Sequence, residues 1–208
     1  MIIIGLAAGG FIFWQSKKPV SIENLLKINS TLQMNETQQK LYQDVIEGLR
    51  KDPGHYKTLF YLARLKQDLL DYEGAIELYE RLTKERPGDI LIWNNLGAIY
   101  YNQEKYEKAE EMQLKILSIS AKWYNAYEEL FTIYQFHLKD KRQDLEKILL
   151  RGLEEYPEMK ASLLAKLAVY YDELMNNKEK AIEYYEKALK ENYNETMAKR
   201  LKELKKEK

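Results

Sequence analysis

Apolar residues recur along this chain at spacings of three, four and seven positions, with charged and polar residues between them. The pattern is most regular between positions 90 and 123, where Trp93, Leu96 and Tyr100 fall at i, i+3 and i+7 and therefore share one face of a helix. Gly97 is small at a position where a second helix can come close. The pattern predicts an all-α chain built from packed pairs of helices.

The same stretch carries a recognisable signature. Its residues follow the spacings W-x2-L-G-x2-Y and Y-x2-A, formed by Trp93, Leu96, Gly97 and Tyr100 and by Tyr106 and Ala109. This signature resembles the tetratricopeptide repeat (TPR), a helix–turn–helix unit of about 34 residues. The resemblance implies an all-α, TPR-type right-handed α-solenoid of helix–turn–helix repeats with a C-terminal capping helix.

Steps of about 34 residues in both directions divide most of the chain into five repeats. They span residues 22–55, 56–89, 90–123, 124–159 and 161–193, and a charged capping helix follows at 194–208. The capping helix carries one narrow apolar stripe, and its basic residues serve either to keep the end of the array soluble or to contact an acidic surface. Extra residues are expected in the turn of the fourth repeat and near Met175 in the fifth.

The first repeat fits the signature less well, as an end unit of an array often does. Its first helix is expected to carry an apolar stripe formed by Leu25, Ile28 and Leu32. Asn35 followed by Gln38 predicts a capping box that opens its second helix.

Residues 1–18 begin with an apolar, uncharged run, MIIIGLAAGGFIFW, which ends before Lys17 and Lys18. A helix over Ile2 to Trp14 would span about 20 Å, against a hydrocarbon core of about 30 Å. Lysine side chains that reach the interface and an interfacial tryptophan extend that span. The run therefore predicts a single-pass membrane anchor, with a cleaved signal peptide and a buried helix of the array as alternatives.

The same two lysines bear on the side of the membrane that the repeats occupy. By the positive-inside rule, Lys17 and Lys18 place the repeat domain in the cytoplasm. An extracytoplasmic repeat domain is the alternative, because folded domains cross membranes largely regardless of charge.

Composition narrows the class of partner. The chain of 208 residues has 33 basic and 33 acidic side chains, which gives no reason to expect nucleic acid as the main ligand. The absence of cysteine excludes disulfides, a thiolate nucleophile and cysteine-ligated zinc.

No combination of residues in the sequence resembles a catalytic centre. His55 and His137 are far apart, each is near a predicted turn, and neither has a carboxylate at ligand spacing. No phosphate-binding glycine loop and no metal-ligand motif is present. We therefore expect no enzymatic activity, no cofactor and no metal.

The resemblance implies a concave groove lined by the first helix of each repeat, at its second, fifth, ninth and twelfth positions. In this chain the positions favoured for partner binding hold Lys57, Phe60, Arg64, Asn94, Tyr101, Asn125, Glu128 and Gln135. The last repeat contributes Ser162, Ala165, Val169 and Asp172 to the same surface. Amide side chains can form hydrogen bonds with a peptide backbone, and the aromatic rings can anchor apolar side chains. The alternative interpretation is a solvated groove that binds no ligand.

The function expected from these features is that of a non-catalytic adaptor, which holds a protein or peptide partner in the groove at a membrane. The alternative is a homo-oligomeric scaffold of an envelope-assembly or secretion complex, a role suggested by resemblance to anchored bacterial TPR proteins.

Overall fold

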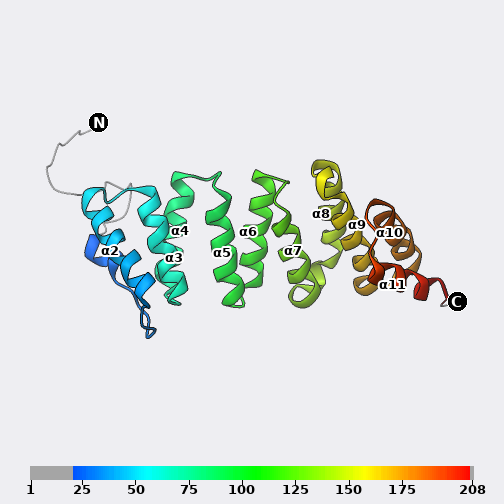
Figure 1. Ribbon diagram of the computed structural model, residues 1–208, viewed down its shortest axis with the longest axis horizontal. Coiled ribbons are helices and arrows are strands. Elements are labelled where there is room, and N and C mark those ends of the chain that lie inside the picture. Colours follow the sequence, from blue (N-terminus) through cyan, green and yellow to red (C-terminus); the bar gives the residue numbers. More distant parts are fainter. Residues whose placement is uncertain (1–20, 207–208) are drawn as a thin grey trace. The chain divides into compact units, whose positions relative to one another are not determined.

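The computed structural model describes residues 21–206, and every regular element in that range is helical. The helices are α1 (Ile22–Leu26), α2 (Glu36–Lys51), α3 (Tyr56–Asp68), α4 (Tyr72–Glu85), α5 (Ile90–Asn102), α6 (Tyr106–Ile119), α7 (Tyr124–Thr132), α8 (Arg142–Glu155), α9 (Lys160–Val169), α10 (Lys178–Glu191) and α11 (Glu195–Lys206). Short 3-10 turns, η2 (Lys139–Lys141) and η3 (Pro157–Met159), precede α8 and α9. The all-α prediction is confirmed (Figure 1).

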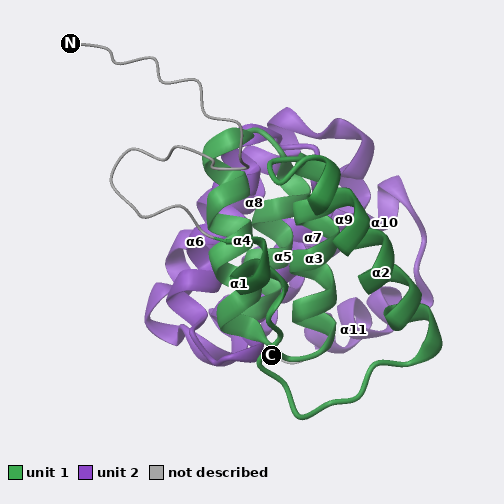
Figure 2. Ribbon diagram, turned by 90° about the vertical axis from the view of Figure 1, so that its left-hand side faces the viewer, with its two compact units in different colours: residues 1–99 green, residues 100–208 purple. Residues whose placement is uncertain are grey.

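Two compact units make up the chain (Figure 2). Among the described residues, unit 1 covers 21–99 and unit 2 covers 100–206, so the boundary falls near the end of α5. Each unit has its own buried core.

The core of unit 1 lies among α2, α3 and α4. Leu49, Leu59 and Leu82, one from each helix, are completely buried. Helices α2 and α3 approach closely because Gly48 has no side chain: a Cβ there would lie 2.9 Å from the side chain of Thr58. The apolar stripes of these helices therefore meet as their period predicts.

The core of unit 2 contains several tyrosines. Tyr127 and Tyr134 are 1% exposed. The ring of Tyr127 packs against Gly152 of α8, where a Cβ would lie 2.8 Å from the ring, and its hydroxyl donates to the carbonyl of Ala121 at 3.1 Å. The rings thus fill the core while their hydroxyl groups find partners at its edge.

Side-chain caps mark several helix starts. The predicted capping box is confirmed: the Asn35 side chain accepts from the Gln38 N–H at 2.9 Å, and the Gln38 side chain accepts from the Asn35 N–H at 3.1 Å. Asp71 and Asn177 cap α4 and α10 in the same way, each accepting from the N–H three residues on.

The first repeat departs from the prediction. Its first helix, α1, has only five residues, so the stripe of Leu25, Ile28 and Leu32 does not form, and Leu32 is 49% exposed. One local cause of the early end of α1 lies just after the helix, where the Ser30 hydroxyl accepts a hydrogen bond from the Leu32 N–H at 3.0 Å. Serine side chains that bond nearby backbone in this way compete with helix formation.

A second cause lies outside the repeat. The backbone N–H of Asn29 donates to the carboxylate of Asp71 at 3.2 Å, and the ammonium of Lys66 donates to the carbonyl of Lys27. These contacts bind the chain after α1 in a non-helical form, because its backbone groups find partners in α3 and at the start of α4.

Extra residues in the last two repeats are accommodated partly as predicted. The connection of the fourth repeat, residues 138–141, is longer than the connection 69–71 between α3 and α4, as expected. In addition, π-helical turns, η1 (Ile133–His137) and η4 (Tyr170–Leu174), lengthen the ends of α7 and α9, and in the fifth repeat the extra residue lies in η4 and not in the turn near Met175. A π-helical turn accommodates one more residue per turn than an α-helix does. Buried Tyr134 and Tyr170 lie in these turns, so burial of the rings is retained.

The expected membrane anchor at residues 1–18 lies outside the described part of the chain. Within residues 21–206, no helix has both the length and the apolar character needed to cross a membrane.

Candidate functional site

The eight residues predicted to bind a partner divide equally between the units. Unit 1 holds Lys57, Phe60 and Arg64 on α3 and Asn94 on α5, and unit 2 holds Tyr101 on α5, Asn125 and Glu128 on α7 and Gln135 in η1. None of the eight is buried. Their neighbours on α3, such as Leu59 and Leu62, are completely buried, so core and accessible positions alternate with the helical period.

In unit 1 the accessible surface is built around Phe60. Its ring lies 6.5 Å from that of Tyr56 in a stacked arrangement and 5.9 Å from that of Tyr79 in an edge-on arrangement. The guanidinium of Arg86 lies 3.9 Å from the centre of the Tyr56 ring. Lys57, Phe60 and Arg64 follow one another at i, i+3 and i+7, so α3 presents one aromatic ring between two cations.

In unit 2, Tyr101, one of the residues predicted to bind a partner, contacts His137, which the sequence analysis did not assign to the groove. The hydroxyl of Tyr101 lies 3.2 Å from Nε2 of His137. The imidazole also stacks on the ring of Tyr106, with 3.6 Å between the ring centres. His137 was expected to be a solitary histidine in a turn, and the π-helical turn η1 instead places it in an aromatic cluster.

A cavity of about 360 Å³ opens among α7, α9 and the start of α11. It is lined by Tyr124, Phe131, Ser162, Ala165, Lys166, Val169, Asn194 and Met197. Three of these, Ser162, Ala165 and Val169, belong to the surface that the TPR register assigned to the last repeat. The cavity has the size of a small-ligand or side-chain site.

An ion pair borders the cavity between α7 and α9. The ammonium of Lys166 lies 2.9 Å from the carboxylate of Glu128 and 4.6 Å from the centre of the Phe131 ring. Burial acts to raise the pKa of Glu128, but hydrogen bonds from Tyr124 and Lys166 and the lysine charge outweigh it, so the pKa lies below its usual range. Burial and the hydrogen bond to Glu128 raise the pKa of the Tyr124 hydroxyl.

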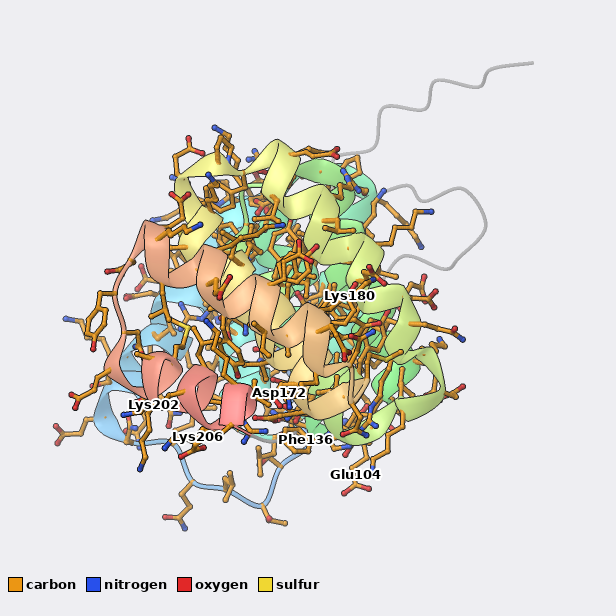
Figure 3. All side chains as sticks on the ribbon, turned by 90° about the vertical axis from the view of Figure 1, so that its right-hand side faces the viewer. Glu104, Phe136, Asp172, Lys180, Lys202 and Lys206 are labelled. Atoms are coloured by element: carbon orange, nitrogen blue, oxygen red, sulfur yellow. The ribbon has the colours of Figure 1, made fainter. Side chains whose placement is uncertain are left out.

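A second ion pair joins α11 to the end of α9. The guanidinium of Arg200 donates to both carboxylate oxygens of Asp172 at 2.8 Å, and Asp172 also accepts from the Tyr185 hydroxyl at 3.2 Å. Figure 3 shows Asp172 beside α11. These hydrogen bonds, led by that of Arg200, lower the pKa of Asp172. The pair therefore fixes α11, and with it Met197, against the cavity.

Sequence reasoning missed the residues that complete this site. Lys166 occupies a helix position that the register does not assign to the groove. Met197 belongs to a helix interpreted as a solubilising cap or as a basic tail that contacts an acidic surface, and not as part of the groove. Phe131 is 7% exposed, and it occupies a position where the repeat signature usually has a small residue. The one available signal was the register, which placed Ser162, Ala165 and Val169 on a common face.

Within residues 21–206, no three His, Cys, Asp or Glu side chains gather as a metal site. Nδ1 of His55 lies 2.8 Å from the hydroxyl of Thr58, and the Thr58 side chain is largely buried. What both units present is a set of accessible aromatic, amide and charged groups.

Comparison with known proteins shows which repeat this chain contains and which fold it has. Residues 60–127 and residues 161–195 match family models described as tetratricopeptide repeat. The crystal structure of MamA is similar to this chain with a TM-score of 0.56 and 16% identity, over 76% of this chain and 95% of that one. The chain therefore contains tetratricopeptide repeats in an α-solenoid fold of the TPR type, and such repeats generally mediate protein–protein interactions.

Two further similarities concern larger proteins. The structure of Naa15/Naa10 bound to HypK-THB aligns with a TM-score of 0.55 and 18% identity, over 83% of this chain and 26% of that one. The BBSome complex member BBS4 homolog of Drosophila melanogaster is 28% identical over 120 residues, which is 56% of this chain. The chain spans about a quarter of the length of that relative, 24%.

Proposed function

We propose that this chain is a non-catalytic adaptor whose repeats capture a peptide or protein partner. The observation that carries the proposal is the exposure pattern of the first helices. On α3, α5, α7 and η1, the eight predicted binding residues remain accessible while the alternating apolar residues are buried. An accessible aromatic ring flanked by cations or amides, as around Phe60, is the kind of group that anchors a partner.

The proposal includes attachment to a membrane through residues 1–18. The apolar run in that segment, followed by Lys17 and Lys18, supports it. In this proposal the repeats lie on the cytoplasmic side, with the extracytoplasmic side as the alternative. The anchor concentrates the captured partner at the membrane surface.

Site-specific crosslinking in cells tests both parts. A photo-crosslinking amino acid is placed at Phe60 or at Asn94, and another at exposed Arg50 on α2 as the control position. Intact cells or vesicles are treated with protease before lysis, and crosslinked species are then recovered from the membrane fraction. We expect one specific heterologous product from the first two positions, none from Arg50, and protection of the repeats from protease in intact cells.

The outcomes separate the alternatives. If crosslinks form only between copies of this chain, the adaptor function is wrong and the homo-oligomeric scaffold is favoured. Digestion of the repeats in intact cells would place them outside the cytoplasm. Recovery of the protein entirely in the soluble fraction would overturn the anchor without affecting the capture of a partner.

A further inference from the structure

The outer side of α11 carries three lysines in one row. Lys199, Lys202 and Lys206 are exposed and fall at i, i+3 and i+7, so they share one face of the helix. The buried residue of α11, Leu204, lies on the opposite face by the helical period. This lysine row therefore points away from the core of unit 2.

The other cations of α11 already have acidic partners. The guanidinium of Arg200 lies 2.8 Å from the carboxylate of Asp172, and the ammonium of Lys205 lies 2.6 Å from that of Glu186. Within residues 21–206, no carboxylate forms an ion pair with any member of the lysine row. Glu195, one turn before the row, is the acidic residue on the same side of the helix. The row therefore presents positive charge that an external acidic group can pair.

Exposed apolar side chains lie at the ends of two neighbouring helices of unit 2. Phe136, in η1, is 59% exposed, and Met175, the residue after η4, is 42% exposed. The two π-helical turns are joined by a hydrogen bond from the amide of Gln135 to the carboxylate of Glu173 at 3.2 Å. The phenyl ring and the thioether chain therefore belong to the same end of the helix pairs.

The apolar side chains and the lysine row lie along one edge of unit 2. The pair of Arg200 with Asp172 joins α11 to η4, which Met175 follows. Figure 3 shows Phe136, Lys202 and Lys206 in the lower part of the view. Figure 1, which shares the vertical direction, also shows the end of α7 and α11 at the lower edge. A flat surface laid against this edge would therefore meet both kinds of side chain.

The exposed acids on the turns of this edge have lysine neighbours. Glu104, which Figure 3 also shows in the lower part of the view, is followed by exposed Lys105. Asp140, in the turn after η1, is preceded by exposed Lys139. The turns therefore carry little net charge, and the lysine row gives this edge its positive character.

We propose that this edge of unit 2 lies against an anionic membrane surface. The lysine row pairs with acidic lipid headgroups, and the side chains of Phe136 and Met175 enter the interface between headgroups and acyl chains. An acidic peptide would satisfy the lysines but would leave the two apolar side chains in water, whereas a lipid surface accommodates both. The inference goes beyond the proposed function and does not depend on an anchor in residues 1–18.

A single fluorescent label tests this contact, because the natural chain has no cysteine. Met175→Cys places an environment-sensitive dye on the edge, and Ser118→Cys is the control at another exposed position. Helix α6 begins just after the turn of Glu104, so Ser118 lies about 18 Å further along that helix. The labelled full chain is mixed with phosphatidylcholine vesicles, or with vesicles in which phosphatidylserine replaces part of the phosphatidylcholine.

We expect the label at position 175 to shift its emission to shorter wavelength on the phosphatidylserine vesicles and not on phosphatidylcholine alone. Lipids that carry a quencher in the headgroup should quench it, and added salt should reverse the shift because salt screens the lysine charges. The label at position 118 should not respond. A response from both labels, or an equal response to both kinds of vesicle, would overturn the proposal.

Matched charge variants locate the contact. The lipid concentration that gives half of the shift should rise by at least about tenfold when the lysine row is neutralised, as Lys199→Gln/Lys202→Gln/Lys206→Gln. It should rise by less than about twofold when three exposed lysines elsewhere in unit 2 are neutralised, as Lys122→Gln/Lys147→Gln/Lys190→Gln. Both variants lose the same net charge, so equal effects would show that the row is not the contact. Circular dichroism checks that both retain their helices.

A further variant and a competing ligand complete the test. Phe136→Ser should raise the required lipid concentration by about threefold through loss of apolar burial, and an unchanged requirement would contradict the proposal. A glutamate-rich peptide serves as the alternative ligand. If that peptide shifts the label at position 175 and the phosphatidylserine vesicles do not, the lysine row binds an acidic protein and the proposal is wrong.

Discussion

Lys66 and Asp71 form an ion pair of 2.8 Å in which the side chains are only 4% and 2% exposed. Both partners have further bonds: the lysine ammonium donates to the carbonyl of Lys27, and the carboxylate accepts from the N–H groups of Asn29 and Gly74, each at 3.2 Å. One buried pair thus caps α4 and binds the segment that follows α1. A buried pair of this kind is stable only while every partner is in place.

Removal of the carboxylate should therefore be costly. We expect Asp71→Ala to lower the free energy of unfolding by about 3–5 kcal/mol, because the Lys66 ammonium is left buried without its counter-charge and α4 loses its cap. Asp68→Ala, at an exposed position near the end of α3, should change it by less than about 0.5 kcal/mol. Urea unfolding followed by circular dichroism measures both; equal effects of the two substitutions would show that the pair does not stabilise unit 1.

Gly74 offers a test in which two effects have opposite signs. Glycine inside a helix usually costs about 0.5–1 kcal/mol relative to alanine, so helix propensity alone predicts that Gly74→Ala stabilises α4. A Cβ at this position would lie 2.6 Å from Oδ2 of Asp71 and 2.8 Å from Nζ of Lys66. We expect the clash to dominate and Gly74→Ala to destabilise by about 1–3 kcal/mol.

Gly88 provides the matched control for that substitution. A Cβ at Gly88 would have no atom of the described residues within 4 Å. Gly88→Ala should therefore leave the thermal midpoint nearly unchanged, while Gly74→Ala lowers it. A rise in the thermal midpoint for Gly74→Ala would contradict this prediction, because it would mean that the side chains of Lys66 and Asp71 move aside for the new Cβ at little cost.

The pair of Arg200 with Asp172 gives unit 2 a dependence on acid pH. The pKa of Asp172 is lowered in the folded chain, so the pair contributes stability above the unfolded pKa and loses it as pH falls through the lower folded value. Arg200→Gln should destabilise by about 1 kcal/mol at pH 7, a modest value because Arg200 is 40% exposed. The difference from the natural chain should shrink as pH falls below about 4.

The measurement is urea unfolding at a series of pH values for both chains. Glu203→Gln removes the other acidic neighbour of Arg200, at 3.6 Å, and should cost less because Glu203 is 49% exposed. A difference between the Arg200→Gln and natural chains that stays constant down to pH 3 would exclude Asp172 as its source.

Much of the fold follows from local sequence because each repeat uses short-range signals. The cap of α2 at Asn35 and the burial of the Tyr127 and Tyr134 rings depend on residues three to seven positions away, and a local pattern can reveal such relationships. The early end of α1 could not be predicted in this way, because it depends in part on Lys66 and Asp71, about 40 positions further along the chain. A buried lysine has no signature in a pattern of apolar spacing.

The candidate site shows the same division. Helical register correctly separates the accessible face of α3, with Phe60 and Arg64, from its buried face. Register alone could not indicate that Lys166 would lie between Glu128 and Phe131, or that Met197 would close a cavity. Those contacts depend on how α7, α9 and α11 pack, and each helix by itself is compatible with other arrangements.

The last prediction concerns the surface of unit 1. Arg64→Ala/Asn94→Ala removes a cation from α3 and an amide from α5, both outside the core, so helicity and the unfolding midpoint should be unchanged. Partner recovery from membranes should fall by about fivefold or more if these side chains contact the partner, since contacts near the centre of an interface carry most of its affinity. The control is Arg50→Ala/Asn24→Ala, which removes the same two side-chain types from exposed positions of α2 and α1. Equal recovery by the two double variants would exclude Arg64 and Asn94 from partner binding, because both variants lose the same charge and the same amide.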